Sequence, residues 1–107
     1  LYDVAVSDDR QIGEDGRCRK PVGNTVNVGE ATYTNAIGAP FLQASWTDPD
    51  FDPQHRAFYY IRTLESPTPR WTTYDDKIFG VERPKDVPAS IQERAYTSPI
   101  WYTPATP

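Results

Sequence analysis

The sequence predicts a mainly β protein, an antiparallel β-sandwich or sheet with long loops and at most one or two short helices. Three observations lead to this prediction: several short runs alternate with a period of two, proline-rich breaks separate them, and a single segment looks helical. Aromatic residues make up 13% of the 107 residues and all hydrophobic residues 37%, so large rings must supply much of any core. Without helical crossovers, the strands are expected to pair antiparallel.

The predicted strands of the first half follow this alternation. Residues 1–6 read as a half-buried strand, and residues 25–35 read as two short β segments with a kink at Gly29. Residues 41–47 alternate again, with the even-numbered side chains inward. Between the first two segments, residues 7–24 are charged and rich in glycine, which indicates a long exposed connection.

The stretch WTDPDFDPQHRAFYYIRTLESPTPRW, residues 46–71, predicts a turn, a strand and a second turn. Prolines and aspartates at positions 48–53 cannot continue a helix or central strand, so the chain reverses there. Residues 57–65 form the expected strand, with aromatic side chains on both faces as in a strand that is covered on each side. Two prolines within residues 66–70 then interrupt it.

The helix is predicted over residues 71–79, with Thr72 or Thr73 as its cap and Gly80 as its end. Residues 91–95 are expected to form one helical turn, and residues 98–103 a final strand. The whole of 1–107 is predicted to be a single β-rich segment of something longer, or a processed product, because it opens on Leu1 and contains no Met.

Charge and hydropathy argue against two classes of partner. The chain has 11 basic and 15 acidic residues, a net charge of −4, and its basic residues are scattered, so nucleic-acid binding is not expected. No apolar run approaches the roughly 18 residues of a membrane span. The single cysteine, Cys18, cannot form an internal disulfide and is interpreted as an incidental surface thiol.

Three aspartates at alternate positions, Asp48, Asp50 and Asp52, superficially resemble the start of a calcium loop. An EF-hand needs glycine at the sixth position and glutamate at the twelfth, and Pro53 and Tyr59 stand there instead. A capped surface turn is the main interpretation, and a cation site at the three aspartates is the alternative. No cofactor is expected in this chain.

Four residues are candidates for binding a substrate: Arg70, Trp71, Glu93 and Arg94. A carboxylate and guanidinium groups near aromatic rings can grip an anionic ligand. The structural alternatives are that Arg94 anchors the last strand and that Arg70 forms a cation–π pair with Trp71. With His55 as the sole histidine, a zinc site and a Ser-His-Asp triad are not expected, and no catalytic residue is predicted.

The strings WTDPDFDPQHRAFYYIRTLESPTPRW and QERAYTSPIWYTP, with VGNTVNV and YTNAIGAP upstream, closely resemble the C-terminal end of the domain of unknown function 3604 family. The resemblance implies a larger, often exported or periplasmic bacterial protein similar to the metal-dependent phosphoesterases of the polymerase-and-histidinol-phosphatase (PHP) superfamily. A divalent metal would be held by that protein's catalytic portion, so no ligand is carried over to this chain. Cys18 and the charged residues 8–20 depart from the family pattern.

Two hypotheses about function therefore compete. In the first, the chain is a non-catalytic β segment that packs on or caps the catalytic portion of a metal-dependent hydrolase, which is then its partner. In the second, the chain is a free-standing β module that recognises a glycan or a protein through exposed aromatic residues. The sequence sets neither the substrate nor the oligomeric state.

Overall fold

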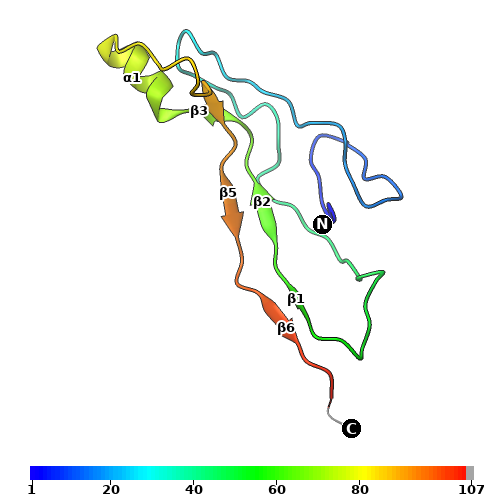
Figure 1. The fold of residues 1–107 in the computed structure, drawn as a ribbon. Coiled ribbons are helices and arrows are strands. Elements are labelled where there is room, and N and C mark those ends of the chain that lie inside the picture. The colour runs from blue at the N-terminus through cyan, green and yellow to red at the C-terminus, as the bar shows by residue number, and fades with distance from the viewer. Residues whose placement is uncertain (106–107) are drawn as a thin grey trace.

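The computed structural model describes residues 1–105, and it is elongated, with extents of 66 × 28 × 23 Å (Figure 1). Small antiparallel sheets and one short helix make it mainly β, which confirms the predicted class; the sheet, and not the sandwich, is the form found. The elements are β1 (Ala57–Tyr59), β2 (Arg62–Leu64), β3 (Thr68–Pro69), α1 (Trp71–Phe79), β4 (Ser90–Ile91), β5 (Arg94–Tyr96) and β6 (Ile100–Tyr102).

The six strands follow one another along a single two-stranded ribbon. Strand β1 pairs with β6, β2 with β5 and β3 with β4, each pair antiparallel. Helix α1 and residues 80–89 close the ribbon at one end, and the ribbon extends from there to the end of the molecule where the C-terminus lies (Figure 1). The predicted strands at 57–65 and 98–103 are therefore found, the first of them in two pieces.

Two bulges divide the ribbon. Tyr59 lies opposite Ile100 and Arg62 opposite Tyr96, so residues 60–61 face the three residues 97–99. At this bulge the Ile61 N–H donates to Thr97 Oγ1 at 2.9 Å, which satisfies a group that the regular ladder would have paired.

The second bulge places residues 65–67 opposite 92–93. A proline, Pro67 or Pro99, lies in each bulge, where its missing N–H costs no ladder hydrogen bond.

Residues 91–95 do not form the expected helical turn, because they belong to this ladder. They span β4 and β5, and the Glu65 N–H donates to the Glu93 carbonyl oxygen at 2.9 Å between the two strand pairs. Their pairing partners lie about 30 residues earlier in the chain, and a local pattern does not contain that information.

Helix α1 covers the predicted residues, but its start differs from the prediction. Arg70 is the N-cap, in an extended conformation and without a side-chain cap hydrogen bond among the described residues. Its carbonyl oxygen accepts from the Thr73 N–H at 2.9 Å. The expectation that Thr72 or Thr73 caps the helix is wrong, because the Thr73 hydroxyl donates to the Ala89 carbonyl oxygen at 2.7 Å and ties the helix to the residue before β4.

The predicted end of the helix is confirmed. Gly80 has φ 66°, and its N–H donates to the Asp76 carbonyl oxygen at 2.9 Å. Glycine takes this left-handed conformation without the steric cost that a Cβ would add. Lys77 lies in the last turn and pairs with Glu30 at 3.2 Å, which connects the helix to the first half of the chain.

The first half of the chain is mostly irregular. Within residues 1–56 the only ladder contact is an isolated bridge between Asn27 and Thr32, so the strands predicted at 1–6 and 41–47 are wrong, and that at 25–35 reduces to this bridge. Polar and apolar residues alternate in these segments, but no neighbouring strand pairs with them. In residues 1–6, for example, the Asp3 N–H donates to the Gly16 carbonyl oxygen at 2.8 Å without a ladder around it. Alternation without a neighbouring strand does not make a strand.

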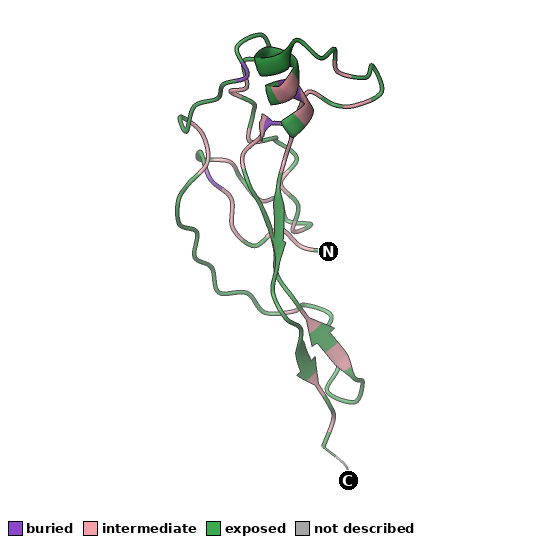
Figure 2. Ribbon diagram, turned by 90° about the vertical axis from the view of Figure 1, so that its left-hand side faces the viewer, coloured by how far each residue is buried: buried purple, intermediate pink, exposed green. Residues whose placement is uncertain are grey.

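Hardly any hydrophobic side chain is buried. Among residues 1–105, Ala31 is the only buried hydrophobic residue, and Ser7 and Thr73 are the buried polar ones (Figure 2). The expectation that the strand at 57–65 is covered on each side is wrong, because every residue of β2 is exposed. The radius of gyration is 18.9 Å, whereas a compact domain of this length has about 13 Å.

The two adjacent threonines of α1 give a matched test of this end of the ribbon. We expect Thr73→Val to lower the free energy of opening of α1 by about 1 kcal/mol, because it removes one of the two donors of the Ala89 carbonyl oxygen, the other being the Arg70 N–H. Thr72→Val removes a buried hydroxyl that has no partner among the described residues, so it should be neutral or stabilising. Amide hydrogen exchange of α1 measures both, and equal destabilisation by the two variants would contradict the assignment.

Candidate functional site

The four predicted substrate-binding residues do not form one cluster. Arg70 and Trp71 lie at the start of α1, and Glu93 and Arg94 lie where β5 begins. Trp71 is 66% exposed, and the described residues contain no side-chain hydrogen bond or ion pair between any two of the four. Their role in binding a substrate remains a prediction.

The structural alternatives for the two arginines also lack contacts. The Arg94 side chain has no hydrogen bond or ion pair within residues 1–105, and its place opposite Leu64 is set by backbone pairing. Arg70 makes no cation–π contact with Trp71 in the described part of the chain. The Arg70 backbone N–H donates to Ala89 at 2.9 Å, whereas its Nε is buried without a partner among those residues.

The acidic turn is held by its own aspartates. Asp48 Oδ1 accepts the Asp50 N–H at 3.0 Å, and Asp52 Oδ1 accepts the Gln54 N–H at 2.8 Å. Asp52 Oδ2 also lies 2.9 Å from Nδ1 of His55. Side-chain acceptors of this kind take the place of a backbone carbonyl oxygen in Asx-turns.

Two tyrosines donate hydrogen bonds to aspartates of this turn. The Tyr2 hydroxyl donates to Asp50 Oδ2 at 2.7 Å and the Tyr59 hydroxyl donates to Asp48 Oδ2 at 2.6 Å. Each hydrogen bond, with some burial and the neighbouring negative charge, raises the pKa of the tyrosine that donates it. Trp46 lies between the two rings, 5.1 Å from Tyr2 and 6.3 Å from Tyr59 by centroid distance.

The three aspartates of the turn form hydrogen bonds within the chain. The residues that the structure describes contain no group of three His, Cys, Asp or Glu side chains placed to hold a metal ion. Asp48 and Asp50 join the start of the chain and β1 to the turn, and Asp48 also accepts the Asp50 N–H within the turn.

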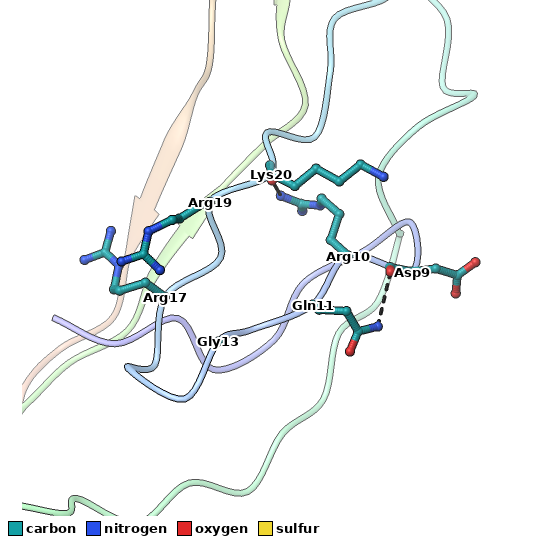
Figure 3. Close-up of a pocket in the computed structure, with 7 residues that line it drawn as sticks. All are labelled: Asp9, Arg10, Gln11, Gly13, Arg17, Arg19 and Lys20. Atoms are coloured by element: carbon teal, nitrogen blue, oxygen red, sulfur yellow. Dashed lines mark hydrogen bonds between the residues drawn. The ribbon is translucent and has the colours of Figure 1, made fainter.

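A hollow of about 390 Å³ lies on the charged loop of residues 9–20 (Figure 3). Three arginines border it, but their groups are already engaged within the loop and its surroundings. Arg17 pairs with Asp3 at 3.3 Å, Arg19 pairs with Asp15 at 2.6 Å, and Arg10 donates to the Lys20 carbonyl oxygen at 3.1 Å. The cations therefore hold the loop in shape.

The ribbon carries a row of exposed aromatic rings, which we call the aromatic ladder: Phe58, Tyr60, Tyr96 and Trp101. The Phe58 ring centroid lies 5.3 Å from that of Trp101 and 6.3 Å from that of Tyr60, and Tyr60 lies 6.2 Å from Tyr96. The four side chains are between 54% and 72% exposed. They form the longest connected set of exposed aromatic contacts in residues 1–105.

The chain itself covers part of the other face of the ribbon, around Tyr59 and Tyr102. Tyr59 packs on Trp46, and Tyr102 packs on Phe51 with centroids 4.9 Å apart. The Tyr102 hydroxyl also donates to the Pro53 carbonyl oxygen at 3.0 Å. Residues 46–53 thus fold over one face and leave the aromatic ladder on the opposite one.

Sequence reasoning did not select the aromatic ladder as a site. The alternation at residues 58 and 60 was visible, but the pairing with Tyr96 and Trp101 depends on the register of β1 with β6 and of β2 with β5. The period-two pattern predicts two faces for the strand, and it does not say which face the chain covers.

Comparison with known proteins places the chain in a family. The sequence matches the family described as a protein of unknown function (DUF3604) over residues 1–104, and the chain belongs to that family. Neither the curated proteins nor the solved structures give a match. Among residues 1–105, no helix has the length and apolar character needed to cross a bilayer.

The tyrosine hydrogen bonds make a pH prediction. We expect Tyr2 and Tyr59 to ionise at higher pH than ordinary tyrosines, and Asp48→Asn with Asp50→Asn to lower both pKa values toward normal, because the negative acceptors are gone. Since the folded-state pKa is raised, the stabilising effect is present below the ordinary pKa and is lost as pH rises through the raised one. Tyrosinate absorbance measured against pH follows both groups.

The matched control for this experiment is Asp52→Asn, since Asp52 bonds to Gln54 and His55 and to no tyrosine. The control should leave the tyrosine titration as in the wild type. Superimposable curves for the wild type and the double variant would show that the two bonds do not form in solution.

Proposed function

We propose that this chain is a non-catalytic supporting segment of a larger DUF3604 protein, and that it packs on or caps the catalytic portion of that protein. The single observation that supports the proposal is the exposure of its hydrophobic side chains. Twenty large hydrophobic residues of the described chain are at least 36% exposed, while Ala31 alone is buried. Monomeric proteins rarely leave apolar surface of this extent without a partner.

The total exposed area of the chain is large enough for an extensive interface with a partner. The chain exposes 8738 Å², whereas a folded protein of 12.1 kDa exposes about 6,000 Å², an excess of about 2,700 Å². A standard protein interface buries about 800 Å² on each partner. The excess exposed area is therefore larger than the area that one standard interface buries on one partner, as expected of a segment that packs along a larger protein.

The proposed parent protein is a hydrolase similar to the PHP-superfamily metal-dependent phosphoesterases, exported or periplasmic, with its divalent metal held outside this chain. In that arrangement Arg70, Trp71, Glu93 and Arg94 would border the active-site cleft at most. Arg70 and Trp71 lie at the closed end of the ribbon, beside Ala89.

One observation favours the second candidate function, a free-standing module that recognises a glycan or a protein. The aromatic ladder is a continuous row of exposed rings, and exposed aromatic rows are typical of binding surfaces. The two proposals differ in what they require of the isolated chain, because a module must fold alone and a supporting segment need not.

The isolated chain tests the first proposal. We expect it to bind a hydrophobic dye strongly, to aggregate or to melt without a cooperative transition, because its apolar surface lacks the cover that stabilises it. Solution size and thermal unfolding measure this behaviour. Cooperative melting as a soluble monomer would contradict the supporting role and favour the module.

A second arm of the test concerns chemistry. With divalent metal and a generic phosphoester, the isolated chain should show no metal-dependent turnover. Reproducible turnover that a chelator abolishes would place a catalytic site within these residues and would overturn the proposal.

A further inference from the structure

The aromatic ladder has a distinct charge. Register places Arg62 opposite Tyr96 and Arg94 opposite Leu64, so both arginines continue the face that carries the ladder. At the other end, Arg56 lines a hollow of about 240 Å³ together with Phe58 and Trp101. Arginines therefore stand at both ends of the row of rings.

The acidic residues next to these arginines along the strands lie on the other face. Glu65 and Glu93 flank β2 and β5 at the alternate positions, which point to the other face in a pleated strand. Within residues 1–105, Arg56, Arg62 and Arg94 form no ion pair, and all three are exposed. The ladder face is thus positive in a chain whose net charge is −4.

This combination argues against a second copy of the chain as the occupant. Two ladder faces laid on each other would bring arginines against arginines without a carboxylate between them, and like charges across an interface are unfavourable. An isologous dimer through this face would therefore oppose its own charges. The partner that fits the charge is acidic.

The distribution of exposed apolar surface favours a protein over an acidic glycan. An oligosaccharide stacked on the aromatic ladder would leave α1 as it is, with Trp71, Ile78 and Phe79 between 66% and 71% exposed. A protein surface can continue past the ladder along the ribbon and cover these side chains too. Exposed aromatic residues together with arginine are also the residue types that dominate protein interfaces.

We propose that the aromatic ladder, with Arg56, Arg62 and Arg94, docks on an apolar protein surface bordered by carboxylates in the remainder of the DUF3604 polypeptide. The inference rests on the proposed supporting function and adds the face that docks and the chemistry of its partner. Apolar contact with the rings supplies affinity, and the arginines at both ends fix the orientation by pairing with the carboxylates.

Hydroxyl-radical footprinting of the ladder rings tests the inference. It compares the full-length encoded polypeptide with the isolated chain. We expect Tyr60, Tyr96 and Trp101 to be protected in the encoded polypeptide. Reversing two charges, Arg62→Glu with Arg94→Glu, should reduce this protection about tenfold, because each glutamate would face a carboxylate.

The matched control reverses two exposed cations away from the ladder, Lys20→Glu with Lys85→Glu, and makes the same change in net charge. It should leave the protection of the rings unchanged. An equal loss of protection in the control would contradict a specific role for the ladder arginines.

The remaining outcomes separate this inference from the proposed function. If Ile78 and Phe79 are protected in the encoded polypeptide while the ladder rings react as freely as in the isolated chain, the supporting function stands and this docking face is wrong. If neither set is protected, both proposals fail. Protection of the ladder by a soluble polyuronate, and not by the polypeptide itself, would show that the face binds an acidic glycan.

Discussion

The antiparallel pairing of residues 57–64 with residues 94–102 is the constraint on which the rest of the structure depends. Both ends of the pairing are fixed by local chemistry: α1 and Gly80 close the ribbon at one end, and the acidic turn folds over one face at the other. A two-stranded ribbon has two faces and no interior, so it cannot enclose a core by itself. The large exposed apolar surface follows from this geometry.

The sequence predicted the parts of the fold that depend on neighbours in the chain. Helix α1, its glycine end and the acidic turn each rest on residues within a few positions, and all three appear in the structure. The N-cap prediction failed because Thr73 bonds to Ala89, a residue outside the local pattern. The strands predicted in residues 1–47 failed for a related reason, since strand formation needs a partner strand and not alternation alone.

The candidate site shows the same division. Arg70, Trp71, Glu93 and Arg94 were chosen by residue type, and the register of the ribbon separates them into two pairs. The register also assembles the aromatic ladder from distant parts of the sequence, such as Phe58 and Trp101, which no short motif could indicate. Only Arg94 belongs to both the earlier candidates and the proposed docking face, and its position opposite Leu64 explains why.

The prolines of the ribbon affect its two outer edges. Both outer edges of a two-stranded ribbon offer unpaired backbone groups, a template on which other chains can stack into fibrils. Pro67 and Pro99 sit in the bulges and Pro69 sits in β3, so each removes an N–H from an edge and interrupts its regular spacing. The same residues that interrupt the ribbon would therefore slow amyloid growth.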